Sequence, residues 1–220
     1  MQDQPGSYGL ALHTTTPELG MALDNGAGDR HQRVLDLGRG MAGELHLQLA
    51  EFLHPRQWKD LRFIAAARGP GGFTGARMGL VVARTLAQQL NLPVFALSTL
   101  AAYAVQQWEQ GSVPSDRAIA LDMRAQRGQY FTAVYARSAN TAVPKALIPD
   151  QVLSPEDWQT QLETGIEGAP HFVRVTVTES LADSVGSLLN LARQHYEQGD
   201  RPTWAEALPF YGQHPVTIKP

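Results

Sequence analysis

Short apolar runs along the chain predict β-strands in both halves, because each run is bounded by turn residues and has a length typical of a strand. In the first half the predicted strands are residues 8–12, 20–23, 33–37, 63–67 and 94–96. In the second half they are residues 118–121, 129–136, 143–148 and 172–177.

Apolar residues at helical spacing lie between these strands and predict the helices. Met41, Leu45, Leu49, Phe52 and Leu53 fall on one face, and Pro55 ends that helix. Further helices are expected over residues 75–90, from Ser98 to about 108, after Ser154, and over residues 181–196. Each half therefore reads three strands, helix, strand, helix.

This repeated order favours an α/β protein with mixed sheets and flanking helices. It is the plan of the two-lobed actin-like, hexokinase-like (ASKHA) fold, with the second lobe reduced. Because residues 110–115 contain Gly111 and Pro114 and read as a linker, the expected lobes are residues 1–109 and 110–220. The aperiodic tail from Leu208 onward is expected to pack back on the first lobe.

Composition narrows the classes of function. Of 220 residues 43% are hydrophobic, and the net charge of −3 gives no bulk attraction to nucleic acid or to an anionic membrane. The absence of cysteine excludes disulfides, thiol catalysis and cysteine metal sites. No secretory leader is expected, and no apolar run approaches the ~20 residues of a membrane span.

The segment from Arg68 to Gly79, RGPGGFTGARMG, carries the strongest local signal. It has no lysine, so it is no phosphate-binding P-loop, and Thr74 stands where a dinucleotide fingerprint needs its third glycine. Backbone amides at a helix N-terminus can still bind an anion, here around Gly71, Gly72, Thr74 and Arg77. The alternative is a structural turn that lets the helix start close to the sheet.

Two stripes on the following helix raise a second hypothesis. Gly75, Gly79, Ala83 and Ala87 recur every four residues, and Met78, Val82, Leu86 and Leu90 form an adjacent apolar stripe. Small residues at this spacing permit close helix contact. A subunit interface is therefore predicted over both stripes, extended by Met41, Leu45 and Leu49. Packing of the stripe against the sheet of its own lobe remains open.

Catalytic patterns are weak. His13 lies at the first hairpin turn, where a nucleotide-cleft lobe would carry an acid, and Asp122 holds the equivalent turn of the second half. No two histidines have the spacing of a zinc peptidase, and no serine nucleophile elbow is present. Arg124 and Arg127, beside the second hairpin turn, are candidate phosphate contacts or simply solvated residues.

Several segments together resemble the TsaB (YeaZ) family. Residues 69–79 are similar to its Gly-Pro-Gly-Ser-Phe-Thr-Gly-x-Arg-x-Gly signature, with Gly72 in place of the serine. Further similar segments follow in the family's order, at residues 10–16, 97–100, 120–130 and 208–211. The resemblance covers nearly the whole chain.

The resemblance implies a cytoplasmic, non-catalytic scaffold in the complex that forms N6-threonylcarbamoyladenosine in tRNA. Its expected partners are a TsaD-type catalytic paralogue and a TsaE-type ATPase, with tRNA reached through the complex and a homodimer when the chain is alone. The resemblance implies no cofactor or metal of its own, although ATP or ADP is compatible with the complex.

Two departures from the family pattern keep an alternative open. The family usually has aspartate at the position of His13, and Gly72 lacks the serine hydroxyl. The alternative is a nucleotide-binding kinase or ATPase of the same fold. Such an enzyme needs a pair of acids in the cleft, and the histidine at position 13 argues against it. A peptidase finds no support in the residues.

Overall fold

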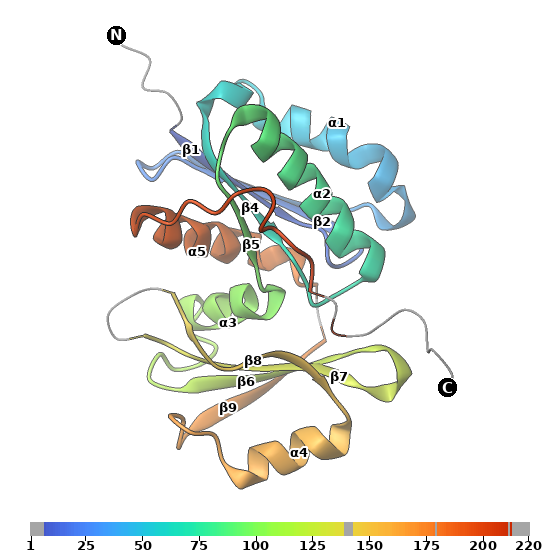
Figure 1. Ribbon diagram of the computed structural model, residues 1–220, viewed down its shortest axis with the longest axis vertical. Coiled ribbons are helices and arrows are strands. Elements are labelled where there is room, and N and C mark those ends of the chain that lie inside the picture. The colour runs from blue at the N-terminus through green and yellow to red at the C-terminus, as the bar shows by residue number, and fades with distance from the viewer. Residues whose placement is uncertain (1–6, 139–142, 179, 211, 213–220) are drawn as a thin grey trace. The chain divides into compact units, whose positions relative to one another are not determined.

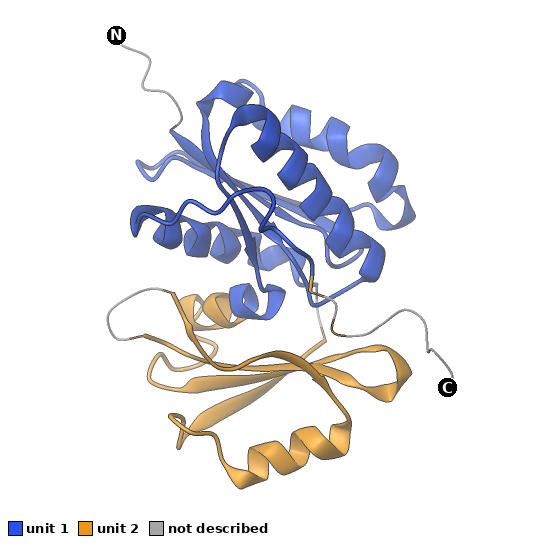
Figure 2. Ribbon diagram, viewed as in Figure 1, with its two compact units in different colours: residues 1–103, 180–209 blue, residues 104–179, 210–220 orange. Residues whose placement is uncertain are grey.

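The computed structural model describes residues 7–138, 143–178, 180–210 and 212. The chain divides into two compact units (Figure 2). Unit 1 contains residues 1–103 and 180–209, and unit 2 contains residues 104–179 and 210–220. These units differ from the predicted lobes, residues 1–109 and 110–220, because the first division falls after residue 103 and residues 180–209 belong to unit 1.

Unit 1 is built on a five-stranded mixed sheet in the order β3-β2-β1-β4-β5 (Figure 1). The strands are β1 (Tyr8–His13), β2 (Glu18–Asp24), β3 (Arg30–Asp36), β4 (Leu61–Ala67) and β5 (Val94–Leu97). β1, β2 and β3 pair antiparallel, whereas β4 and β5 run parallel to β1. Since β1, β2 and β4 are buried along almost their whole length, both faces of this sheet must be covered.

Helices cover the two faces of the first sheet. α1 (Met41–Leu53) and α2 (Phe73–Leu90) share one core with Leu19 and Met21 of β2. The neighbouring Gly20 points the other way, toward Ala182 and Val185 at the start of α5 (Val185–Glu197). The alternation of β2 thus separates two cores, with α1 and α2 on one face and α5 on the other.

Unit 2 is a four-stranded sheet in the order β8-β7-β6-β9 (Figure 1). The strands are β6 (Ala118–Arg124), β7 (Tyr130–Ala136), β8 (Lys145–Leu153) and β9 (Phe172–Val177). α4 (Pro155–Thr164) begins as predicted at a Ser154 cap, whose hydroxyl accepts from the N–H of Asp157 at 3.0 Å. This sheet has no counterpart of β5 among the described residues, as expected for a reduced second lobe.

The remaining helices are short or lie at the boundary. α3 (Thr99–Glu109) contains the division between the two units. The single-turn 3-10 helices are η1 (Gly38–Gly40), η2 (Trp58–Asp60), η3 (Gln126–Gly128) and η4 (Ala182–Ser184).

The α/β fold class and the order of elements are those that the sequence predicts. α5 follows the predicted order, but it packs on β1, β2 and β4 of the first sheet rather than on the second. The segment after it also joins unit 1, since the N–H of Val94 donates to the carbonyl of Pro202 at 3.1 Å and Ala207 is buried. The tail predicted to pack on the first lobe begins at Leu208, which belongs to unit 1, but Phe210 instead contacts Phe131 of β7 in unit 2. Residues 211 and 213–220 of this tail lie outside the described residues.

Candidate functional site

The glycine loop between β4 and α2 docks on the turn that joins β1 to β2. The N–H of Gly72 donates to the carbonyl of Thr15 at 2.6 Å, and the carbonyl of Gly69 accepts from the N–H of Thr99 at 2.9 Å. Gly69 has φ 104°, a backbone conformation that favours glycine. A Cβ on Gly71 would lie 2.5 Å from the carbonyl oxygen of Thr15. The glycines therefore serve a close backbone contact.

Thr14 fastens the start of α2 to the same turn. Its hydroxyl donates to the carbonyl of Gly75 at 2.7 Å and accepts from the N–H of Gly79 at 3.1 Å. A Cβ on either glycine would come closer than 3.0 Å to Thr14. Two glycines one helical turn apart thus fit around a single buried threonine.

This geometry changes the expected anion site. The amide of Gly72 is occupied by Thr15 and Gly71 packs against it, so those two positions face the protein rather than a ligand. Arg77 lies over the ring of Phe73, with its guanidinium carbon 3.5 Å from the ring centroid. Thr74 is exposed. A contribution of Thr74 and Arg77 to anion binding stays a prediction.

The small-residue stripe of α2 faces inward. Ala83 and Ala87 are fully buried against the sheet, in line with Gly79. The stripe is therefore the packing face of α2 within unit 1, which is the alternative that the sequence left open. Its assignment to a subunit interface is wrong for Gly79 and Ala83, which are buried against Thr14 and the core. For Gly75, which is half-buried beside Thr14, the assignment stays a prediction.

The same correction applies to α1. Met41, Leu45 and Leu49 are all buried in the core that α1 shares with β2. They are the inner face of an amphipathic helix, and they cannot contact a partner unless the unit opens. By contrast, Met78, Val82 and Leu86 of α2 are only half-buried.

Sequence reasoning placed Met78 and Val82 at an interface but missed the exposed apolar side chains on the outer side of both helices. Leu47 of α1 is 56% exposed and Val81 of α2 is 59% exposed, although both are large apolar residues. Gly43, Ala50 and Thr85 are exposed as well. We call this surface the outer α1–α2 face: Gly43, Leu47, Ala50, Met78, Val81, Val82 and Thr85. The sequence does contain a signal for Leu47, because this leucine lies outside the apolar face that the helical spacing assigns to the core.

His13 is fully buried at the end of β1. Burial lowers the pKa of its imidazole to about 3, and the nearby Glu18 carboxylate opposes this shift only in part. Its Nε2 lies 3.5 Å from the hydroxyl of Thr15. A neutral, enclosed imidazole cannot replace the acid that would hold a magnesium-bound phosphate.

Asp122, at the equivalent position of unit 2, is buried and fully engaged. Its carboxylate accepts from Arg174 Nε at 2.7 Å, Thr176 Oγ1 at 2.9 Å and the indole N–H of Trp158 at 3.3 Å. These contacts join β6 to β9 and α4. The acid predicted at this turn thus has a structural role, because it links three elements of unit 2.

Other classes of site find little support. Within the described part of the chain, no cluster of three histidine or carboxylate side chains is placed to hold a metal ion. No described helix has both the length and the hydropathy needed to cross a bilayer. Arg127 has φ 59° within η3, and Arg124 is exposed beside it.

A family described as "TsaD: tRNA N6-adenosine threonylcarbamoyltransferase" matches residues 54–182, more than half of the chain. A Haemophilus influenzae protein described as "tRNA threonylcarbamoyladenosine biosynthesis protein TsaB" is 31% identical over 171 residues, covering 71% of this chain and 72% of that protein. The chain belongs to this TsaD-like family and, within it, to the TsaB/YeaZ proteins.

Two further relatives agree. The TsaB protein of Bacillus subtilis is 33% identical over 105 residues, and the match spans 48% of this chain and less than half (43%) of that relative. A Pseudomonas aeruginosa crystal structure, described as an uncharacterized protein similar to peptidase YeaZ, superposes with a TM-score of 0.76. It is 25% identical and covers 94% of this chain and 100% of its own. The TsaB/YeaZ resemblance and the two-lobed fold are therefore confirmed.

Proposed function

We propose that this TsaB-family protein is a non-catalytic subunit of the machinery that forms threonylcarbamoyladenosine in tRNA. In this role it binds a TsaD-type paralogue and holds it in an active conformation. The names of its relatives support a role in the biosynthesis of threonylcarbamoyladenosine in tRNA. The state of His13 and Asp122 supports a non-catalytic role, because neither side chain is available to a metal-bound phosphate.

The outer α1–α2 face carries the proposal of partner binding. Burial of apolar area drives association in water, and a docking surface should combine exposed apolar side chains with few charges. Leu47 and Val81 provide such side chains, and the other members of the face are small or uncharged. The inner faces of the same helices are already packed, so only this side is free for a partner.

The test uses Leu47→Glu and Val81→Glu, which place a carboxylate on the face without touching the core. Leu208→Glu is the matched control, because Leu208 is also an exposed leucine (58%) of unit 1 but lies outside both helices. Binding to the organism's TsaD-type protein would be measured by calorimetry and by light scattering after size exclusion. We expect at least tenfold weaker binding for both test variants, as for central interface residues, with unchanged thermal unfolding.

Two results would contradict different parts of the proposal. If wild-type protein forms no complex with the TsaD-type protein, the partner is wrong. If the complex forms and both glutamate variants bind like wild type, the partner stands and the surface is wrong. An assay of tRNA modification with the TsaE-type ATPase then separates binding from activation.

The alternative of a nucleotide-dependent kinase or ATPase predicts magnesium-dependent binding of ATP to the isolated chain. Calorimetry with ATP and magnesium tests this directly. The expected result is no metal-dependent binding, since the cleft position of unit 1 holds the buried neutral His13.

A further inference from the structure

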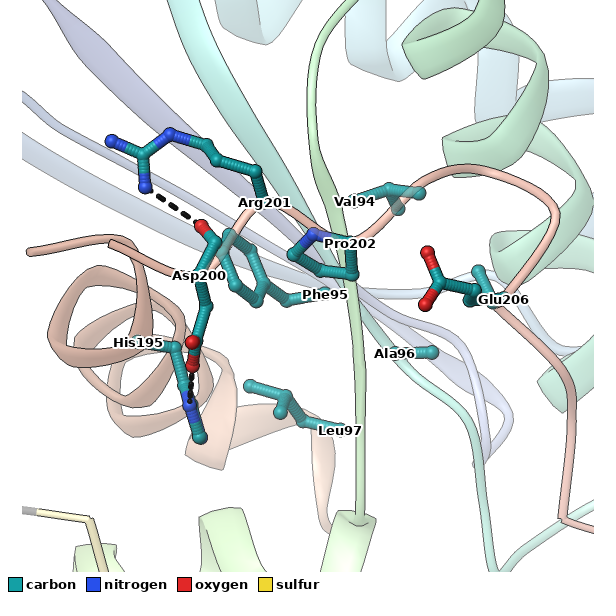
Figure 3. A pocket seen from close by; sticks show the side chains of 10 residues that line it. Val94, Phe95, Ala96, Leu97, His195, Asp200, Arg201, Pro202 and Glu206 are labelled. Atoms are coloured by element: carbon teal, nitrogen blue, oxygen red, sulfur yellow. Dashed lines mark hydrogen bonds and ion pairs between the residues drawn. The ribbon is translucent and has the colours of Figure 1, made fainter. Parts of the chain in front are cut away.

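A cavity of about 470 Å³ lies beside β5, the edge strand of the first sheet. Its floor is formed by the strand itself, and its walls come from the end of α5 and from the segment that follows (Figure 3). All of its lining residues belong to unit 1. Phe95, Leu97 and Pro202 give it apolar surface, and His195, Asp200 and Glu206 stand at its rim.

The backbone of β5 pairs with β4 on one side only and turns its other side to the cavity. β4 donates to the carbonyls of Pro93 (from Ile64, 3.0 Å) and Leu97 (from Arg68, 2.9 Å), and the parallel register has no bulge. Because inward and outward groups alternate along a strand, Val94 and Ala96 present their N–H and C=O groups at the open edge.

The chain itself shows how this edge binds main chain. The outward N–H of Val94 donates to the carbonyl of Pro202 at 3.1 Å. The outward groups of Ala96 have no such partner among the described residues. The outward N–H of Val94 is therefore occupied, whereas the outward N–H and C=O of Ala96 are open to a further peptide group.

The rim of the cavity is acidic. Asp200 Oδ2 pairs with His195 Nδ1 at 2.9 Å, and Glu206 Oε2 accepts from the N–H and hydroxyl of Thr203 at 2.6 and 2.8 Å. In the described structure the second oxygen of each carboxylate has no hydrogen bond. The bonds from Thr203 lower the pKa of Glu206, so this group is ionised at neutral pH.

Arg201 also lines the cavity, but in the described structure it forms no ion pair with either carboxylate. The guanidinium of Arg201 is turned onto the ring of Tyr196, 3.7 Å from its centroid. One of its nitrogens donates to the carbonyls of Tyr196 and Asp200. Figure 3 shows Asp200 and Glu206 on opposite sides of β5, so a carboxylate flanks the strand on either side.

We propose that this cavity binds an extended peptide segment of a partner protein, which adds a strand at Ala96. The peptide backbone pairs with Ala96, an apolar side chain fills the space over Phe95 and Leu97, and a lysine or arginine meets Asp200 or Glu206. Strand addition of this kind takes affinity from main-chain bonds and selectivity from side-chain pockets. The site lies apart from the outer α1–α2 face and does not depend on the function proposed for it.

The probe is a blocked hexapeptide that alternates valine with lysine or threonine, acetyl-KVTVKV-amide, titrated into the ¹⁵N-labelled full chain. Two control peptides replace lysine by glutamate or carry N-methyl groups on the central residues. We expect amide shifts centred on Val94, Ala96 and Leu97, and slower hydrogen exchange at the N–H of Ala96. The glutamate and N-methyl peptides should bind at least tenfold more weakly.

Asp200→Asn with Glu206→Gln should weaken the lysine peptide at least tenfold, because both acids leave the rim. Glu44→Gln with Glu51→Gln is the matched control, since it removes the same charge from exposed positions on α1 and should leave binding unchanged. The proposal is overturned if the shifts lie outside β5 and the rim, if N-methylation has no effect, or if no shift occurs at millimolar peptide. None of these results bears on TsaD binding, so the two proposals fail separately.

Discussion

Gly75→Ala tests the close contact between the start of α2 and the β1–β2 turn. The new Cβ would overlap the carbonyl oxygen of Thr14, and its carbonyl carbon would lie only 3.3 Å away. Both are backbone atoms, so no side-chain rotation relieves the contact. The helix start must move away from the turn, and the two hydrogen bonds of the Thr14 hydroxyl must lengthen.

The magnitude follows from three contributions. Overpacking of a close contact costs about 1–3 kcal/mol. Weakening two hydrogen bonds costs about 1 kcal/mol each. Replacing glycine by alanine in a helix returns about 1 kcal/mol. The free energy of unfolding should therefore fall by about 2–4 kcal/mol, the opposite sign from helix propensity alone.

Urea unfolding followed by circular dichroism measures this change. Gly43→Ala on α1 is the matched control, because Gly43 is exposed and its added Cβ meets nothing within 4 Å. That variant should keep or gain up to about 1 kcal/mol. If Gly75→Ala is as stable as wild type, the close contact with Thr14 is wrong, and the small-residue stripe becomes available for a partner again.

Two further predictions concern buried polar groups. The folded pKa of His13 lies below its unfolded value, so the free energy of unfolding should fall as pH drops from about 6.5 toward 3, by up to about 1.4 kcal/mol per pH unit. In urea unfolding measured at several pH values, His13→Asn should flatten this slope between pH 6.5 and 5. An unchanged slope would show that other groups cause the pH dependence. Arg174→Met removes the ion pair of the buried Asp122 carboxylate and should cost about 3 kcal/mol in thermal or urea unfolding, whereas a cost below about 1 kcal/mol would show that the pair is dispensable.

The sequence by itself determined the order of strands and helices, the duplicated plan and the glycine loop. These are local properties: apolar period, turn residues and caps act over a few residues and do not depend on distant partners. The cap at Ser154 and the shared helix face of Met41, Leu45 and Leu49 follow from such patterns, and both are present. The sequence assigned that face to a partner, whereas the structure buries it in the core of unit 1.

Only the tertiary structure decided which way α2 faces. Its two stripes are adjacent and both apolar, so periodicity gives no preference between core and partner. The position of Thr14, more than 60 residues earlier, turns Gly75 and Gly79 inward and leaves Val81 outside. Likewise α5 follows β9 in sequence but packs on β1, β2 and β4, because the choice of sheet depends on long-range contacts that no local pattern encodes.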